Sequence, residues 1–292
     1  MIEIVNSIDR DTFYRKFVAP GKPVLIKGGT RNWPALEKWN YDYFKKMGDA
    51  VSVPLKTGDV SKGNKTIMTV AEYTALLEQY ERLPADARQQ SPRPPYLHDV
   101  PVFLLLPALK QDVDPFPSYL LPSWYGSEWW KFVQFFMGST DSLTPLHFDT
   151  LCTHNLFFQV HGSKKFYLVA AKDRDKCYLK SWRWAGVDLE HPDLGKYPLL
   201  KEAEIDAVVV EPGDILFMPS GTLHQVRGLS YSISFNIDWH TPGSVMSGLL
   251  SGFRGAPRRN VLYNSVVAAG LYLGIPSRYL FRYYQPYLNY VS

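Results

Sequence analysis

The chain has 292 residues, of which 46% are hydrophobic, 15% aromatic and only 21% charged, and its formal net charge is +4. This length and apolar share are enough for one large or two small domains with a sizeable core, and the abundant aromatic residues exclude disorder over most of the chain. The scattered Gly and Pro residues and the lack of a persistent heptad exclude a collagen-like or coiled-coil fibre.

The first part of the chain alternates short helical and strand patterns. Residues 22–29 have the pattern of a buried strand closed by a turn. Asn40 is a candidate N-cap for a short helix that Gly48 ends, and residues 69–72 form a capping-box sequence at the start of a longer helix. Residues 84–95 are rich in Pro, Arg, Gln and Ser and predict a surface loop.

The middle of the chain has the pattern of a β protein. Runs of β-type residues recur at residues 132–137, 156–160, 165–170, 207–210, 215–218 and 231–239. Because no helical pattern separates them, they favour an antiparallel sandwich or barrel over a parallel α/β sheet. The final residues return to helical patterns, with Asn260 and Ser277 as candidate N-caps and Gly274 near a helix end.

The amino terminus and the cysteine count favour a cytoplasmic protein. The first residues include an early acid, Glu3, and lack the charged-then-apolar-then-small pattern of a secretory signal. Cys152 and Cys177 are too few for a disulfide framework, so we expect free thiols. The longest apolar run, residues 261–276, contains polar residues and falls short of the roughly 20 residues that span a membrane. We therefore expect no transmembrane helix.

Two motifs carry candidate metal ligands. His147 and Asp149 are two residues apart, so both side chains of an extended strand point to the same side. The segment from Gly213 to His224 has the glycine, proline and histidine spacing of the second cupin motif. A jelly roll brings strands distant in sequence face to face, so His224 can complete a site with His147 and Asp149. Two histidines and one carboxylate form the facial arrangement of non-haem Fe(II) oxygenases.

A further set of polar residues indicates the cosubstrate. An iron enzyme that uses 2-oxoglutarate must bury the far carboxylate of this molecule, which requires a cation and hydroxyl or amide donors. Asn155, Gln159 and Lys164 follow the His-x-Asp motif on the next two strands, and Thr144 precedes it. Residues 231–239 alternate apolar positions with polar ones, so one face of this strand can look into the barrel: Ser232, Ser234, Asn236 and Asp238.

These motifs together resemble the jumonji-C (JmjC) or cupin-8 family, and in particular its factor-inhibiting-HIF type asparaginyl hydroxylases and tRNA-wybutosine hydroxylases. The resemblance covers residues 10–240 and rests on residues 22–28, 33–34, 96–97, 144–149, 155–164, 191–198, 212–224 and 236. It implies a mainly β fold with flanking helices, in which the core is a double-stranded β-helix or jelly roll.

The resemblance also implies roles for eight residues. The iron ligands would be His147, Asp149 and His224. Lys164 and Thr144 would hold the far carboxylate of 2-oxoglutarate, and Tyr96 would add a hydroxyl. Asn155 and Asn236 would line the pocket near the metal.

The activity implied is that of an Fe(II)- and 2-oxoglutarate-dependent oxygenase, which uses O2 to hydroxylate a protein or peptide side chain and releases succinate and CO2. A small molecule or a modified nucleoside stays open as the substrate, and lysine demethylation is a further variant. A metal-binding cupin that works without 2-oxoglutarate is one rival, against which Lys164 and Thr144 argue. A non-catalytic interaction module is another, against which the intact triad argues.

Other residues of these types have simpler structural interpretations. We expect His154 and His161 to be surface or loop histidines rather than metal ligands. The aromatic cluster Trp124, Tyr125, Trp129 and Trp130 is more typical of a core than of a substrate wall. For Cys152 we expect a packing role.

Two segments follow from the motifs and the charge: a catalytic domain with an N-terminal α/β elaboration at residues 1–240, and a helical segment at residues 241–292. The second contains five arginines and no other charged residue, so it carries +5 and leaves −1 for the first. Its apolar and aromatic residues exceed what two short helices bury alone, which favours a homodimerisation element, as the resemblance also implies. Contact with RNA or an acidic protein, and packing on the barrel of the same chain, are the alternatives.

Overall fold

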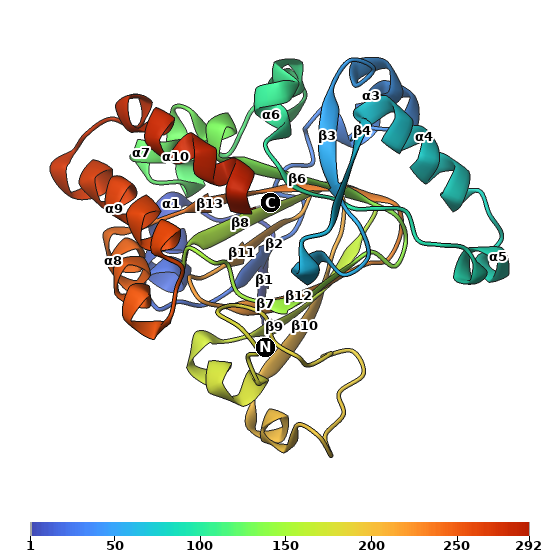
Figure 1. Cartoon of the computed structure of the whole chain (residues 1–292). Coiled ribbons are helices and arrows are strands. Elements are labelled where there is room, and N and C mark those ends of the chain that lie inside the picture. The colour runs from blue at the N-terminus through green and yellow to red at the C-terminus, as the bar shows by residue number, and fades with distance from the viewer. Residues whose placement is uncertain (1, 292) are drawn as a thin grey trace.

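Two β-sheets form the centre of the molecule (Figure 1). The computed structural model describes residues 2–291, except for the side chains of residues 287–291. Within this part of the chain, the larger sheet has, in spatial order, strands β1 (Glu3–Val5), β2 (Val24–Ile26), β11 (Ile215–Met218), β8 (His154–His161), β13 (Ser232–Trp239), β6 (Val133–Gly138) and β5 (Leu97–Val100). The smaller sheet has β10 (Ile205–Val210), β9 (Lys164–Val169), β12 (Leu223–Gly228) and β7 (Leu143–His147).

The strand pairing confirms the predicted jelly roll. Strands β8, β11 and β13 pair antiparallel in the larger sheet, and β9, β10, β12 and β7 pair antiparallel in the smaller one. Each of the six runs of β-type residues predicted in the middle of the chain coincides with a strand to within one residue at its ends, or lies inside one: β6, β8, β9, β10, β11 and β13. A further antiparallel pair, β3 (Ser52–Lys56) and β4 (Lys65–Thr69), lies beside the barrel.

Alternation along β8 explains how the larger sheet packs on both faces. Leu156, Phe158 and Val160 belong to the large core under the helices, whereas Phe157 belongs to the core between the two sheets. Every residue of β8 except His161 at its end is buried. Successive side chains of a strand point to opposite faces, so residues two apart share a face. Asn155 therefore points into the barrel together with Phe157.

The helices of the first part of the chain are α1 (Arg10–Phe13), α2 (Ala35–Lys38), α3 (Tyr41–Met47), α4 (Val70–Glu81), α5 (Ala85–Gln90), α6 (Val102–Leu105) and α7 (Ser123–Gly126), and all of them except α5 contribute to the large core. The predicted caps of two of them are confirmed: the Asn40 side chain accepts from the Tyr43 amide, and Thr69 and Glu72 form the capping box of α4. The loop predicted at residues 84–95 is partly wrong, because α5 forms there. Helix α5 buries no side chain, and its sequence therefore lacks the apolar face by which an amphipathic helix is recognised.

The carboxyl-terminal helices α8 (Pro242–Leu250), α9 (Arg258–Leu273) and α10 (Ser277–Val291) lie together beside the larger sheet (Figure 1). Gly270 lets α9 approach α7 closely, since a Cβ there would lie 2.6 Å from the Trp124 ring. Tyr284 of α10 stacks on Phe132, so the segment packs on its own chain. The division of the chain into units at residues 240 and 241 stays a prediction.

The helix ends of this segment agree only in part with the sequence. Gly274 ends α9 in the left-handed conformation, with φ of 68°. Ser277, predicted as a cap, is instead the first residue of α10, and its hydroxyl donates to the Glu128 carboxylate. The cap predicted at Asn260 is wrong, because α9 begins two residues earlier, after Pro257. The Asn260 amide instead donates to the carbonyl and hydroxyl oxygens of Thr150, 110 residues away in sequence.

Both cysteines are free and buried, as expected. Among residues 2–291, we find no helix whose length and apolar character would allow it to cross a membrane.

Candidate metal centre and cosubstrate pocket

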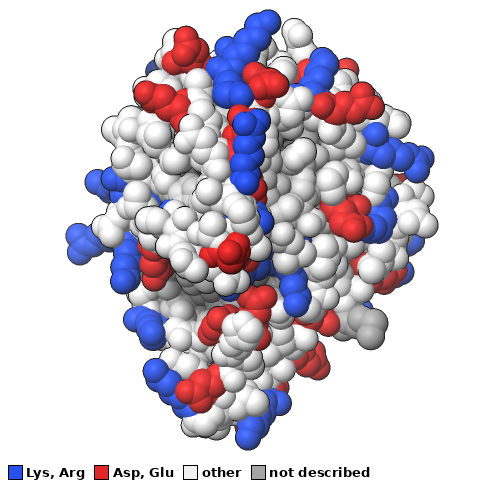
Figure 2. Space-filling view, turned by 90° about the vertical axis from the view of Figure 1, so that its right-hand side faces the viewer, with Lys and Arg blue, Asp and Glu red and all other residues white. Residues whose placement is uncertain are grey.

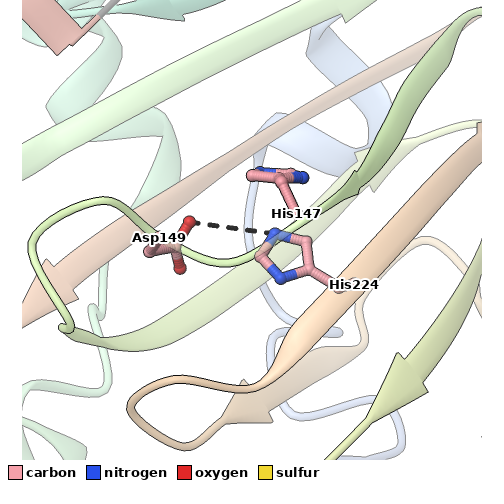
Figure 3. Close-up of side chains that lie close together, drawn as sticks. All are labelled: His147, Asp149 and His224. Carbon is pink, nitrogen blue, oxygen red and sulfur yellow. Dashed lines mark ion pairs between the residues drawn. The ribbon is translucent and has the colours of Figure 1, made fainter. Parts of the chain in front are cut away.

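The three predicted metal ligands meet where two strands of the smaller sheet lie side by side (Figure 3). His147 is the last residue of β7, and His224 of β12 stands directly opposite it in the antiparallel register. Asp149 follows two residues after His147, and its Oδ1 lies 3.8 Å from Nε2 of His224. One ligand atom from each of the three residues lies within 4.8 Å of the other two. This is the spacing that one bound ion requires.

Backbone carbonyls orient both imidazoles. Nδ1 of His147 lies 2.8 Å from the Pro145 carbonyl, and Nδ1 of His224 lies 3.3 Å from that of Thr222. Since a carbonyl only accepts, each Nδ1 carries the proton, and each Nε2 presents a lone pair to the metal position. Burial, and then the neighbouring His224, hold the pKa of His147 well below its usual range. The imidazole is therefore in the neutral form that binds metals.

The donor set fits a divalent iron ion. Two imidazole nitrogens and one carboxylate on one side of a position are the protein ligands of non-haem Fe(II) sites, which leave the opposite coordination positions open. Trp184 stacks on His147 with ring centroids 4.6 Å apart, which fixes the plane of this ligand from the other side.

Lys164 marks the other end of the same cavity. Only 1% of this residue is exposed, and its ammonium donates to the Tyr96 hydroxyl at 3.0 Å and to Oγ of Ser234 at 2.8 Å. Among the described residues, no carboxylate lies within ion-pair distance of it. Burial lowers its pKa to about 7. A buried lysine without a counter-ion is costly, so this end of the cavity is prepared for an anion.

The structure places all eight predicted site residues on the walls of this cavity. Thr144 lies beside the lysine end, and its hydroxyl is 3.3 Å from Nε2 of His98. Nδ1 of His98 in turn lies 3.1 Å from Asp99, whose backbone is left-handed with φ of 59°. Sequence reasoning did not single out this buried His–Asp pair, although His98 stands two residues after Tyr96.

Asn155 and Asn236 form a polar layer next to the metal position. The Asn155 amide donates to Oδ2 of Asp149 at 3.2 Å and to Oδ1 of Asp238 at 3.0 Å, and the Asn236 amide donates to the same Asp238 oxygen at 3.2 Å. Asn155 thus engages one oxygen of the candidate ligand Asp149, while the other faces His224. Burial and the Asp149 carboxylate raise the pKa of Asp238 well above its usual range.

Gln159 does not reach the cavity. Its amide donates to the carbonyls of His161 and Gly162 and so closes the turn between β8 and β9. Ser234, on the polar face predicted for β13, takes the place beside Lys164 instead.

The remaining candidates are structural. His154 is buried, receives a hydrogen bond from the Ser220 amide and packs on Trp239, so it is no metal ligand, but its predicted surface position is wrong. It is the first residue of β8 and stands opposite Trp239 of β13. His161 is half-buried at the end of β8. The aromatic cluster at residues 124–130 packs in or against the core, and Cys152 is buried in a small cluster with Phe148.

A long insertion forms the rim of the cavity. Residues 170–204 connect β9 to β10 and turn back onto the ligand strand, where the amide of Ala185 donates to the Leu146 carbonyl at 2.8 Å and the amide of Phe148 to the Arg183 carbonyl at 3.3 Å. Arg183 lines the cavity together with Thr150 and Leu151 of the loop after Asp149. The rim therefore combines a cation with loop residues that the sequence did not single out.

Comparison with known proteins agrees with this geometry. The profile of the cupin-like domain matches residues 10–244. The chain is 28% identical over 262 residues to the 2-oxoglutarate and iron-dependent oxygenase JMJD4 of Gallus gallus, covering 82% of this chain and 59% of that protein. It is 26% identical to human bifunctional peptidase and (3S)-lysyl hydroxylase JMJD7, covering 78% and 80%. It is 25% identical to human tRNA wybutosine-synthesizing protein 5, covering 82% and 78%. The chain spans about half the length of several other curated relatives that it matches.

Proposed function

The chain belongs to the cupin-like family that includes these JmjC proteins, and from this premise we propose that it is an Fe(II)- and 2-oxoglutarate-dependent oxygenase. We propose further that it hydroxylates a protein or peptide side chain and releases succinate and CO2. The observation that carries the proposal is the single cavity with a two-histidine, one-carboxylate cluster at one end and an unpaired buried lysine at the other.

The roles of the first three residues follow from their orientation. His147, Asp149 and His224 would hold the iron, which together with 2-oxoglutarate and O2 supplies the oxidising chemistry. The carbonyls of Pro145 and Thr222 keep both imidazoles in the correct tautomer before metal arrives. This preorganisation lowers the cost of assembling the site.

Lys164 would hold the far carboxylate of 2-oxoglutarate. Its ammonium already contacts Tyr96 and Ser234, so a bound carboxylate would find one cation and two hydroxyls, with the Thr144 hydroxyl on the same cavity wall. A charge-assisted contact of this kind is short and strong in a dry pocket. The contact would also raise the pKa of Lys164 from its lowered value, so the bound form keeps its charge.

Asp238 and Arg183 would face the substrate. Asp238 shares the cavity wall with the metal cluster, and its Oδ1 is already filled by two amide donors. Arg183 stands at the rim of the same cavity. These two groups give the substrate side a carboxyl group and a guanidinium as hydrogen-bonding partners, which suits a polar side chain held in a fixed orientation.

One face of the molecule, shown in Figure 2, lacks the extended basic patch that would favour a nucleic acid over a protein or peptide substrate. One relative is named a lysyl hydroxylase and another a tRNA wybutosine-synthesizing protein, so the relatives themselves support both classes. A nucleic-acid-binding protein normally carries an extended basic patch. On the face shown in Figure 2, Lys and Arg side chains are interspersed with Asp and Glu.

The test is mass spectrometry of a peptide library incubated with the full chain, Fe(II), 2-oxoglutarate and O2. We expect a gain of one oxygen atom on a peptide, with succinate formed in step, and neither product when any one component is left out. The variant Asp149→Ala is the matched control. Succinate formation that is equal in the variant would contradict the metal assignment, and oxygen gain on a nucleoside but on no peptide would contradict the substrate class.

We also propose that the helical segment forms a homodimer. It exposes large apolar and aromatic side chains, which are typical of interfaces: Met246, Leu250, Phe253, Leu262, Tyr272, Leu273, Tyr279 and Tyr283. Because the segment also covers Trp124, truncation would expose core, and point variants test the proposal better. Sedimentation should give a dimer for the full chain and a monomer for Leu262→Arg with Leu273→Arg. A monomeric parent chain would refute the proposal. The cytoplasmic location stays a prediction.

A further inference from the structure

A second cleft lies behind the ligand strand, between the insertion and the helical segment. It has a volume of about 790 Å³, more than a single ion needs. The 3-10 helix Ala171–Cys177 of the insertion provides Arg174 and Asp175, and the 3-10 helix Ser251–Arg254 provides Arg254. Trp182 completes the wall toward the catalytic cavity. Neither the metal cluster nor the cosubstrate end of the cavity uses these residues.

Neither arginine of the cleft forms an ion pair in the described part of the chain, although Asp175 lies close enough to attract Arg174. Among the residues that the structure describes, neither guanidinium has a carboxylate within ion-pair distance. Arg174 lies 4.0 Å over the Phe148 ring, makes one long hydrogen bond of 3.5 Å to the Gly221 carbonyl, and has a buried Nε without a partner. Arg254 is exposed and close enough to Arg174 for the two charges to repel each other. An anion between them would remove this repulsion and fill the free donors.

The cleft and the catalytic cavity share a wall. The Trp182 indole donates to the Thr150 carbonyl at 3.3 Å, and Thr150 and the adjacent Arg183 line the catalytic cavity. Phe148, on which Arg174 packs, stands between the two ligands His147 and Asp149. A substrate chain that leaves the catalytic cavity across this wall therefore enters the cleft, and its neighbouring groups meet the two arginines.

We propose that this cleft binds a carboxylate side chain of the polypeptide substrate, so that the enzyme selects a target residue with an acidic residue nearby in the chain. The proposal rests on the proposed function and names the substrate class of the same site. The planar forks of Arg174 and Arg254 match a carboxylate in geometry and charge. Asp175 on the same wall leaves the cleft with a small positive charge, which suits one carboxylate better than a run of phosphates.

Binding of a labelled peptide to the full chain, without iron or 2-oxoglutarate, tests the proposal independently of the reaction. The probe is a fluorescein-labelled, end-blocked peptide of alternating Gly and Glu, and the reference is the same peptide with Gln in place of Glu. Fluorescence polarisation should show that the Glu peptide binds at least about tenfold more tightly than the Gln peptide. We expect Arg254→Gln to abolish this preference. Arg278→Gln, an exposed arginine on α10 outside the cleft, should retain it.

Three outcomes would overturn the proposal: equal binding of the two peptides, no effect of Arg254→Gln, or an equal loss in Arg278→Gln. Stronger binding of a labelled oligonucleotide that Arg254→Gln weakens would also overturn it, in favour of a phosphate site. Arg174→Lys keeps the charge beside Phe148 but loses the planar fork, so it should weaken Glu-peptide binding without unfolding the chain. Since no iron chemistry enters this assay, its failure leaves the proposed oxygenase activity untouched.

Discussion

The two ends of the catalytic cavity are built differently. At the cosubstrate end, Lys164 and Ser234 lie on strands of the two sheets, and their positions follow from strand register. At the rim, Thr150 and Arg183 come from loops that meet across more than 30 residues of sequence. Side chains on paired strands are held in one geometry, whereas loops tolerate change. The difference indicates that the cosubstrate end, which we call the floor of the cavity, is specific for one cosubstrate and that the rim sets the choice of substrate.

The largest effect should come from removing one of the three metal ligands. We expect Asp149→Ala to weaken Fe(II) binding by more than about 100-fold, since even indirect partners of metal ligands cost about 10- to 100-fold. Turnover should be lost with it. Anaerobic calorimetric titration measures the affinity, and circular dichroism checks that the fold is intact. His191→Ala, an exposed histidine of the insertion, is the control that should bind iron normally. Unchanged affinity in Asp149→Ala would remove Asp149 from the site.

The next largest effect should come from a change at the floor of the cavity. Lys164→Met removes the ammonium but keeps the buried chain, so the 2-oxoglutarate requirement should rise by about 10- to 150-fold, which corresponds to about 1.5 to 3 kcal/mol. Lys165→Met, whose side chain packs over Tyr167 outside the cavity, should leave it unchanged. Apparent affinity is measured by succinate formation at varied 2-oxoglutarate. A similar rise of the 2-oxoglutarate requirement in both variants would show that the loss of one positive charge, and not the loss of the Lys164 contact, causes the effect.

The affinity of the floor for 2-oxoglutarate should also depend on pH. The pKa of Lys164, lowered to about 7 by burial, means that the lysine is charged below this value and neutral above it in the ligand-free protein. Binding of the carboxylate must then take up a proton above pH 7, so affinity should fall by about tenfold per pH unit there and stay level below. Calorimetry with Mn(II)-loaded protein measures the profile. A profile that is the same in Lys164→Met would show that another group titrates.

A smaller effect tests the hydroxyl beside the lysine. Ser234→Ala should raise the 2-oxoglutarate requirement by about 2- to 10-fold, because one hydrogen bond contributes about 0.5 to 1.5 kcal/mol. Ser232→Ala lies two residues away on the same strand and does not contact Lys164, so it should have no such effect. If both variants behave alike, packing of the strand rather than the hydroxyl determines the affinity.

The residues at the floor of the cavity are easier to predict from the sequence than those at the rim, for a physical reason. His147 and Lys164 lie on strands, where a period of two dictates direction, and Asp149 follows the end of β7 by two residues, so the structure brings all three to one cavity. Asp238 stood on the predicted polar face, but its approach to Asn155 depends on pairing between β8 and β13. Arg183 lies in an irregular insertion, where no periodicity predicts direction.

The errors have the same origin. The buried position of His154 depends on Trp239 of β13 and on Ser220, and no local sequence pattern indicates these distant contacts. Asn260 was expected as a cap, a local role, but bonds instead to Thr150. Contacts across such long sequence separations are set by the fold as a whole, and a single sequence carries no local signal for them.

The insertion also protects the edge of the smaller sheet while the chain folds. β7 is the outer strand of the smaller sheet, so without a neighbour it would offer free amides and carbonyls to another chain. Ala185 and Arg183 occupy these groups at Leu146 and Phe148. The insertion therefore shields an aggregation-prone edge, and a chain that lacks residues 181–186 would be expected to precipitate through this strand during folding.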